Sequence, residues 1–360
     1  RHPTEGWISD FSIPRNKSFE MATGDAILWM DHDDTLESER DEDPAAALRT
    51  LIDGSMELAN PRADFLEMRY HYIKDPWGHV VLSLPRFRVV RRGHFNWVWP
   101  VHEDLKPVRF VKRRDLRGHF LYVDHHRVHE RDTEPARRNL WIMERHMASG
   151  GAMDSRLWQN VAGSHSALSH WEQAIEAYDK SLALTGSDSE SAFVSLMRKG
   201  DAYVHLGQPE RASESYLRSQ LLYPERKQPW LKLAELCIGV GQTQAALTYS
   251  DIAEAMPAEG RDGFVHIPVL EKSVPLQVRA QAFLSQDKLD AALGCYRELL
   301  KLFPGDKELE AQAAKLTDVL TGEALGNAYR QVASRMSRRQ AIVLGKSAPS
   351  VLAATPAGLR

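Results

Sequence analysis

Residues 193–224 indicate the fold of the C-terminal half of the chain. They read F-V-S-L-M-R-K-G-D-A-Y-V-H-L-G-Q-P-E-R-A-S-E-S-Y-L-R-S-Q-L-L-Y-P. The stretch is helical in character, and small, aromatic and proline residues mark fixed positions in it. These positions are Gly200, Tyr203, Gly207, Ala212, Tyr216 and Pro224. A second unit follows 34 residues later, which indicates that the stretch is one copy of a repeat.

Further units extend the repeat over residues 155–304. The next unit carries Trp230, Leu233, Ala234, Gly241, Ala246 and Ala253 at the corresponding positions. The preceding unit carries Trp158, Ala162, Ala174, Tyr178 and Ser181, and the last carries Ala280, Phe283, Ala292, Tyr296 and Pro304. The set resembles the tetratricopeptide repeat, in which small residues let antiparallel helices approach and aromatic residues fill the space between them. Four units bury a continuous core, so the resemblance implies an all-α solenoid over residues 151–322.

A solenoid of stacked helix pairs presents a concave groove to peptides or partner proteins. The resemblance therefore implies a protein partner on the repeats, and a protein-binding scaffold is one function to consider. Cys237 and Cys295 both fall within the repeats. We predict that they are small packing residues and not reactive thiols.

The composition is that of an ordinary globular protein. The 360 residues carry 46 Lys and Arg against 49 Asp and Glu, a net charge of −3, and 43% are hydrophobic. This balance gives no indication of nucleic-acid binding, and no apolar run approaches the roughly 20 residues of a transmembrane helix. Two cysteines are too few for a disulfide framework or a cysteine zinc site. We expect a soluble protein in a reducing, cytoplasmic setting.

The first 150 residues differ in character and predict an α/β domain. Strand-like runs occupy residues 26–30, 64–72, 79–84 and 120–123, and a helix-length run occupies residues 14–22. The first strand leads directly into D-H-D-D, residues 31–34. Carboxylates at the carboxyl end of a strand are well placed to hold a divalent cation and, through it, phosphate oxygens.

Three kinds of site are compared for D-H-D-D. In a glycosyltransferase, Asp31 and Asp33 bind Mg²⁺ or Mn²⁺, which neutralises the diphosphate that leaves a nucleotide sugar. In a phosphatase of the haloacid dehalogenase type, Asp31 is the nucleophile and Asp33 the acid/base, but the downstream acidic motif with a preceding lysine is missing. A calcium loop fails because Leu36 stands where the turn needs glycine.

The residues ahead of D-H-D-D favour the glycosyltransferase. The positions concerned are Phe11, Arg15, Asn16, Gly24, Asp25, Asp31, Asp33 and Asp34. In this arrangement the segment resembles the family 2 glycosyltransferases of the GT-A fold, especially the bacterial group with C-terminal tetratricopeptide repeats. The resemblance implies an inverting, hexosyltransferase-type enzyme in which Arg15 and Asn16 support the donor site and Asp31 and Asp33 hold the metal.

A second part of the resemblance spans residues 86–105. Arg86 and Arg88 precede the triplet V-H-E, and the resemblance implies that both arginines belong to the nucleotide-sugar site. Inverting transfer needs a base that takes the proton of the attacking hydroxyl. We predict that Glu103 is this base and that His102 orients it or contacts the acceptor.

A histidine pair follows the strand-like run at 120–123. His125 or His126 is a further candidate metal ligand, and the sequence leaves the choice open. About a dozen residues later comes the pair Arg138 and Asn139, which also fits the resemblance.

Together these segments predict a GT-A-like, Rossmann-like domain over residues 1–150 that lacks its first strands, the solenoid over 151–322, and a disordered tail over 323–360. We expect an enzyme that moves a sugar from a nucleotide-diphosphate donor to a saccharide, lipid-linked or protein acceptor. Because the strands that cradle the nucleotide are missing, we expect little activity from this chain alone. A scaffold without activity and a haloacid-dehalogenase-type phosphatase are the alternatives.

Overall fold

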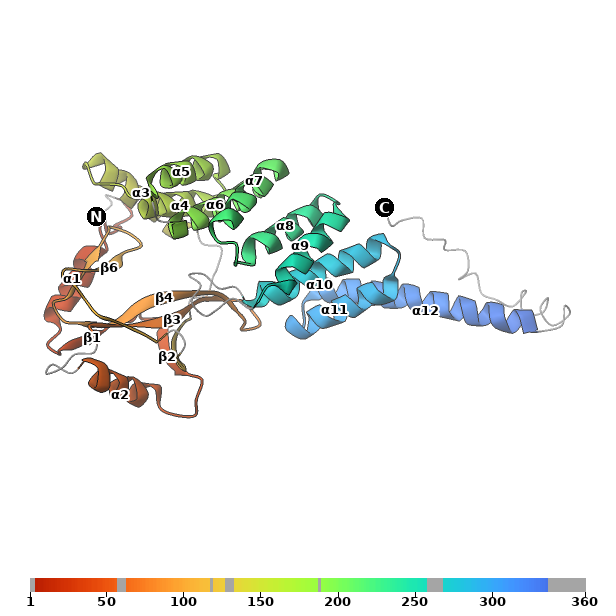
Figure 1. The fold of residues 1–360 in the computed structure, drawn as a ribbon, viewed down its shortest axis with the longest axis horizontal. Helices are drawn as coiled ribbons and strands as arrows, with labels where there is room; N and C mark the ends of the chain where they lie inside the picture. The colour runs from red at the N-terminus through yellow and green to blue at the C-terminus, as the bar shows by residue number, and fades with distance from the viewer. Residues whose placement is uncertain are drawn as a thin grey trace. The chain divides into compact units, whose positions relative to one another are not determined.

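The computed structural model describes residues 4–56, 63–116, 119–126, 133–186, 189–257 and 268–335. The chain divides into two compact units, Arg1–Pro275 and Leu276–Arg360, each considered by itself. Figure 1 shows the first unit as a twisted sheet followed by paired helices. No helix among the described residues is long and apolar enough to cross a membrane.

The sheet of the first unit is mixed. Its strands are β1 (Ala26–Leu28), β2 (Asp34–Ser38), β3 (Phe65–Lys74), β4 (Val80–Arg91), β7 (Arg113–Asp115) and β8 (Leu121–His125). Two helices belong to the same region, α1 (Ser12–Met21) and α2 (Pro44–Met56). The strand order is β1-β4-β3-β8-β2, and β7 also pairs with β3. Both β7 and β8 run parallel to β3, whereas the other pairs are antiparallel.

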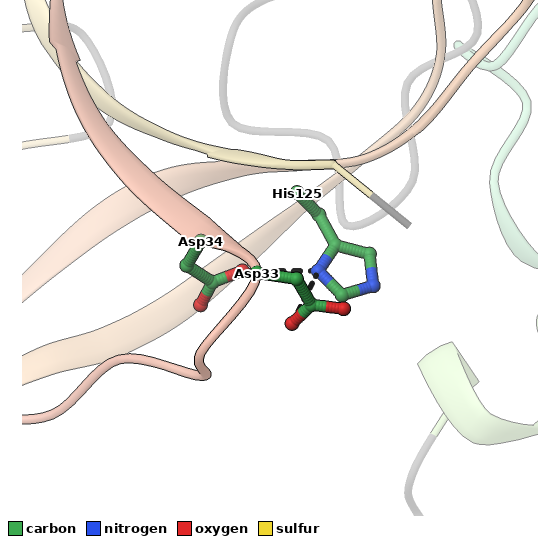
Figure 2. A group of neighbouring side chains, drawn as sticks. All are labelled: Asp33, Asp34 and His125. Carbon is green, nitrogen blue, oxygen red and sulfur yellow. Dashed lines mark hydrogen bonds and ion pairs between the residues drawn. The ribbon is translucent and has the colours of Figure 1, made fainter. Parts of the chain in front are cut away.

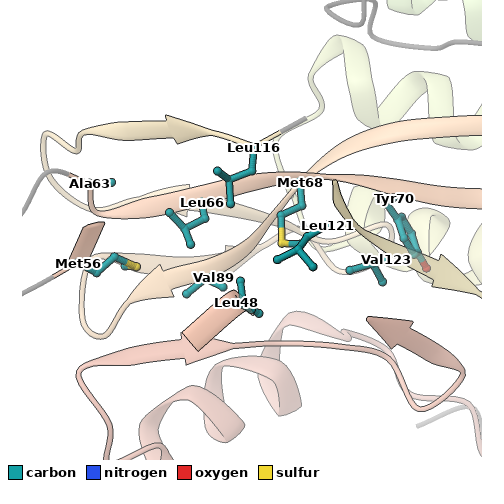
Figure 3. Packing of buried hydrophobic residues seen from close by; sticks show 10 residues of the cluster. All are labelled: Leu48, Met56, Ala63, Leu66, Met68, Tyr70, Val89, Leu116, Leu121 and Val123. Atoms are coloured by element: carbon teal, nitrogen blue, oxygen red, sulfur yellow. The ribbon is translucent and has the colours of Figure 1, made fainter. Parts of the chain in front are cut away.

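The two faces of the sheet bury different cores because successive side chains of a strand point to opposite sides. Leu66 and Val89 pack with residues of α2 on one face (Figure 3). Phe65 and Val90 pack on the other face with Phe19 of α1 and with a hairpin formed by β5 (Phe95–Val98) and β6 (Asp104–Pro107). Helix α1 and the hairpin therefore lie on the same side of the sheet.

Paired helices follow the sheet. They are α3 (Glu134–Ala148), α4 (Ser155–Ala167), α5 (Trp171–Leu184), α6 (Ser189–His205), α7 (Pro209–Leu222), α8 (Gln228–Gly239) and α9 (Thr243–Ala255). Several of the predicted small and aromatic positions are confirmed as packing positions. The fully buried residues include Ala162, Ala174, Ala212 and Ala246, and Tyr216 is almost fully buried. Gly200 lets α6 approach α7, because a Cβ at this position would collide with the ring of Tyr216.

The sheet and the first helices share a core. Val101, between β5 and β6, packs with Ile142 of α3 and Leu157 of α4. Arg156 of α4 also bonds Asp104 of β6, with Nη1 2.8 Å from Oδ2. The division near residue 150 stays a prediction, and it falls within this first unit.

The second unit begins at Leu276, inside α10 (Pro268–Ser285). It continues with α11 (Leu289–Leu302) and α12 (Lys307–Arg335) around a core that includes Tyr296 and Leu299. Helix α12 includes residues 323–335 of the predicted disordered tail. Good helix formers such as Glu323, Ala324 and Leu325 favour a helix there without an apolar face. Residues 336–360 of that tail lie outside the described residues.

Both cysteines are packing residues, as predicted. Cys237 of α8 and Cys295 of α11 are buried free thiols with exposed fractions of 8% and 9%. Burial raises the pKa of both thiols, which keeps them protonated and poorly nucleophilic.

Candidate functional site

Asp34 is the centre of a charged network where the turn after β1 enters β2. Its side chain is fully buried. One carboxylate oxygen accepts hydrogen bonds from the Tyr70 hydroxyl at 2.9 Å and from Nδ1 of His125 at 3.0 Å. The other accepts from Nη1 of Arg88 at 2.9 Å and from the backbone N–H of Asp31 at 3.1 Å. Because each oxygen already accepts two hydrogen bonds, Asp34 positions its neighbours and has little capacity left for a ligand.

Arg88, which the resemblance places at the donor, is held inside this network. Its side chain has no exposed surface, and its guanidinium lies over the rings of Trp29 at 4.2 Å and Tyr70 at 4.0 Å. Burial and the charge of Asp34 raise the pKa of Tyr70, so its hydroxyl remains a donor to Asp34. Arg88 therefore neutralises a buried carboxylate and is not positioned to reach a ligand in solvent.

Asp33 and His125 lie together beside this network (Figure 2). Asp33 is 24% exposed, and its Oδ1 is 3.6 Å from Nδ1 of His125. When Nδ1–H donates to Asp34, the lone pair of Nε2 is available to a metal ion, an arrangement common for histidine ligands. A carboxylate oxygen and an imidazole nitrogen suit a divalent transition metal that keeps positions open for substrate. The sequence could not decide between the histidines, and the structure turns His126 toward Thr35, with Nε2 2.7 Å from Oγ1.

Asp31 points to a different partner. Its Oδ1 is 2.9 Å from Nη2 of Arg15, and Nε of the same guanidinium is 2.5 Å from Oε1 of Glu103. Arg15 also lies over the ring of Trp97 at 4.7 Å. The structure thus brings together three predicted residues that are far apart in the sequence, with Arg15 as the bridge between two carboxylates.

Asn16 holds the hairpin next to α1. Its amide nitrogen donates to the Trp97 carbonyl at 2.9 Å, and its Oδ1 accepts from the Trp97 N–H at 2.8 Å. These two hydrogen bonds to the backbone of Trp97 fix the hairpin that leads to Glu103. Asn16 therefore acts through the backbone in this structure, as a positioning residue.

His102 contacts Asn139, and the structure shows no hydrogen bond from its described side chain to Glu103. Nε2 of His102 is 3.2 Å from Nδ2 of Asn139, whose Oδ1 accepts from Arg138 at 3.2 Å. His102 keeps accessible surface, yet desolvation by the surrounding protein and the charges of nearby arginines lower its pKa to about 4. The neutral ring thus accepts a hydrogen bond from Asn139.

The sequence did not indicate Tyr70 of the Asp34 network, since one tyrosine in a strand gives no signal.

The first unit also contains hollows. One, of about 830 Å³, lies between β1 and α2 and is lined by apolar residues such as Leu28 and Ile52. Another, of about 670 Å³, lies among α6, α7 and α8. Asp201, Lys232 and Glu235 contribute charged groups to this second hollow.

Comparison with known proteins identifies one repeat of the helical region. Residues 194–226, which span most of α6 and α7, match the tetratricopeptide repeat family. This stretch of the chain is a tetratricopeptide repeat. No curated protein sequence matches the chain.

Among solved structures, the similar chains include tetratricopeptide repeat proteins. PilF of Pseudomonas aeruginosa is 17% identical over 51% of this chain and 80% of that one, with a TM-score of 0.36. A thermophilic TPR protein of Thermus thermophilus is 19% identical over 51% and 90%, with a TM-score of 0.37. A tetratricopeptide repeat protein of Parabacteroides merdae is 16% identical over 56% and 72%, with a TM-score of 0.38.

Proposed function

We propose that the repeats bind an extended segment of a partner protein in the groove among α6, α7 and α8. The observation that carries this proposal is the place of the groove, which opens on the repeat matched at residues 194–226. Stacked helical repeats use such concave surfaces for recognition. Its volume of about 670 Å³ lies in the range of pockets that hold drug-sized ligands, which is enough for side chains of a bound segment.

The chemistry of the groove favours a segment with an apolar anchor beside a polar group. Val204 and Val240 line it and are 44% and 46% exposed, so binding would remove apolar surface from water. Asp201 accepts a hydrogen bond from the Tyr216 hydroxyl at 2.8 Å and lies 3.5 Å from Nζ of Lys232. This pair offers both a carboxylate and an ammonium to the backbone or side chains of the segment.

Peptide display on the purified chain tests this proposal. Peptides with a shared motif should bind the wild-type protein and lose at least about tenfold in affinity to the Val204→Glu or Val240→Glu variant, since a charge replaces an apolar contact. Leu221→Glu is the matched control, because Leu221 is 80% exposed on α7 and does not line the groove. Equal binding to all variants would show that the groove is not the site.

A second function, glycosyl transfer from a nucleotide-diphosphate sugar to an acceptor hydroxyl, is supported by the bridge through Arg15. This side chain joins Asp31 to Glu103. Glu103 would take the proton of the attacking hydroxyl, and Arg15 would place positive charge beside the departing diphosphate. Asp33 and His125 would hold Mg²⁺ or Mn²⁺, which stabilises the leaving diphosphate when bound.

Titration calorimetry with UDP and GDP, with and without Mn²⁺, tests the second function. We expect metal-dependent binding that disappears in Asp33→Asn and survives in Asp41→Asn, whose side chain is exposed on the loop before α2. Glu103→Gln should retain nucleotide binding and lose transfer. Release of phosphate from simple phosphate esters, without nucleotide binding, would support the phosphatase instead.

A further inference from the structure

The loop between β6 and β7 projects an aromatic side chain into solvent. Phe110 is 91% exposed, the largest exposed fraction among the large apolar side chains of the described residues, and Val108 is 54% exposed. Single exposed apolar residues are common on protein surfaces. Here two of them stand within three positions, in the run K-P-V-R-F-V-K-R-R at residues 106–114, which contains no acidic residue. Together they form an apolar tip on a basic loop.

The apolar tip is held in place by the chain on both sides of it. On one side, the N–H of Val108 donates to the His94 carbonyl at 2.9 Å. On the other side, the N–H of Lys112 donates to Oδ2 of Asp64 at 2.9 Å, and the Lys112 carbonyl accepts from the Asp64 N–H at 2.8 Å. The side chain of Val111 packs against the core on this face of the sheet. The loop therefore presents its tip from a fixed base.

Three exposed cations accompany the tip. They are Arg109 and Lys112 in the loop itself and Arg92 in the turn after β4. Nη2 of Arg109 donates to the Gly93 carbonyl at 3.1 Å, which places the loop beside the turn that carries Arg92. Within the part of the chain that the structure describes, none of these three cations forms an ion pair with a carboxylate. Their charges are therefore available to a partner.

The carboxylates near the loop do not cancel these charges. Asp64 and Glu67 are buried, and each has the Nε of an arginine beside it, at 3.1 Å and 3.0 Å. Asp25 is exposed, and its carbonyl accepts from the Arg92 N–H at 2.9 Å. Even with Asp25 counted, the exposed charge around the tip is positive.

We propose that residues 106–114 form a membrane-docking loop. Phe110 and Val108 enter the interfacial layer of a lipid bilayer, and Arg92, Arg109 and Lys112 bind anionic head groups. An apolar tip among cations fits this partner because a bilayer offers an apolar layer directly beneath a negatively charged surface. A nucleic acid would match the cations and could stack a base on Phe110, but it gives an aliphatic side chain such as Val108 no comparable contact.

The membrane-docking loop is separate from both proposed functions. None of the groove residues or metal-binding candidates belongs to it. The arginines predicted for the nucleotide sugar lie on β4, where Arg86 is partly buried and Arg88 has no exposed side-chain surface. Variants of the loop should therefore leave peptide binding and nucleotide binding unchanged.

Co-sedimentation of the purified full chain with lipid vesicles tests the loop. One set of vesicles is phosphatidylcholine alone, and the other contains phosphatidylglycerol in equal proportion. We expect binding to the anionic vesicles that falls when salt is raised, because ions screen the attraction. Phe110→Ser should weaken this binding by about tenfold, since an aromatic ring is no longer buried. Leu221→Ser is the matched control, because Leu221 is 80% exposed on α7, outside the loop.

Two matched double variants test the charges. Arg109→Gln with Lys112→Gln should weaken binding to anionic vesicles by about thirtyfold, because each cation near the surface contributes roughly a factor of five. Arg297→Gln with Lys315→Gln removes the same charge from exposed positions on α11 and α12 and should retain binding. Equal losses from the two double variants would show that the net charge of the chain drives binding, which would overturn the proposal.

Fluorescence reports whether position 110 enters the bilayer. Phe110→Trp should retain vesicle binding and add emission that brominated acyl chains quench more strongly than they quench the wild type. Equal quenching in the two proteins would contradict insertion of the tip. Binding of the wild-type chain to heparin or RNA but not to vesicles would assign the loop to a soluble polyanion and would also contradict the inference.

Discussion

The sheet and the repeats bury different kinds of polar residue. In the sheet region the buried polar side chains are mostly charged, namely Asp64, Glu67, Arg88, Arg91 and Asp124. In the repeats they are mostly serines, namely Ser164, Ser181, Ser195, Ser215, Ser219, Ser250 and Ser273. A buried charge needs a partner at a fixed position, whereas a hydroxyl can bond a carbonyl of its own helix.

The contacts follow this difference. Nε of Arg91 in β4 is 3.1 Å from Asp64, which lies just before β3, and Arg88 reaches Asp34 across 54 positions of sequence. Ser215 instead donates to the Arg211 carbonyl one turn earlier, at 2.9 Å. The buried charges of the sheet region are therefore held by long-range pairs. In the repeats, Ser164, Ser215 and Ser219 each bond a carbonyl of their own helix. Four measurements test this difference between the sheet region and the repeats.

The largest effect is expected for Asp34→Asn. The substitution leaves Arg88 buried without its counter-charge, which should lower the free energy of unfolding by about 3–5 kcal/mol. Urea unfolding followed by circular dichroism measures the loss, with Asp41→Asn as the exposed control. A loss equal to that of the control would mean that the buried pair is not what holds β2.

A smaller loss is expected in the repeats for Gly200→Ala. The new Cβ collides with the ring of Tyr216, and overpacking of this kind costs about 1–3 kcal/mol. Gly163→Ala in α4 is the matched control. Its Cβ would meet nothing within 4 Å, so helix propensity should raise stability by up to about 1 kcal/mol. If both variants shifted the urea midpoint in the same direction, close helix approach at Gly200 would not be required.

A gain in stability is expected for Ser250→Ala. The Ser250 hydroxyl is buried and has no hydrogen-bond partner among the described residues. Removing it should raise the free energy of unfolding by about 1 kcal/mol. Ser215→Ala, which removes a hydroxyl that does have an acceptor, should be neutral or slightly destabilising. Equal losses of stability from the two substitutions would show that the Ser250 hydroxyl does make a stabilising hydrogen bond.

The smallest effect is expected from the titration of His102, because its side chain is exposed and solvent screens the charges that lower its pKa. Its pKa is about 4 in the folded protein and 6.5 in an unfolded chain. Between these values the unfolded state binds more protons, so stability falls as the pH drops from 6.5 toward 4. Thermal unfolding of His102→Gln should show a weaker decline across this window. Parallel curves for the two proteins would show that His102 is protonated equally in both states.

The repeats were largely predictable because their information is local. Gly200 and Tyr216 recur with the period of the helix pair, and the spacing alone indicates which residues pack. The order of the sheet strands was not predictable in this way. Strand β2 is absent from the predicted strands because Asp34–Ser38 has two acidic residues and only one large apolar residue. It becomes a strand through pairing with β8.

The candidate site was predictable in its residues but not in its pairings. The sequence indicated Arg15, Asp31, Asp33 and Glu103, yet it grouped Asp31 with Asp33. In the structure, Asp31 instead forms an ion pair with Arg15. A two-residue spacing cannot reveal this, because Arg15 reaches Asp31 only after α1 packs on the hairpin. Arg156 was missed for a similar reason, since its sequence position belongs to the repeats and its contact belongs to the hairpin.

The cluster that contains Val101, Ile142 and Leu157 has a consequence for how the molecule comes apart. Because this cluster is contributed by both the hairpin turn and the first helices, neither can melt without exposing the other. A calorimeter should record the sheet and the first repeat as one heat-absorption peak. A protease that nicks the chain between Gly150 and Gly151 should leave the two fragments associated, with the severed ends still held by the apolar contact between them.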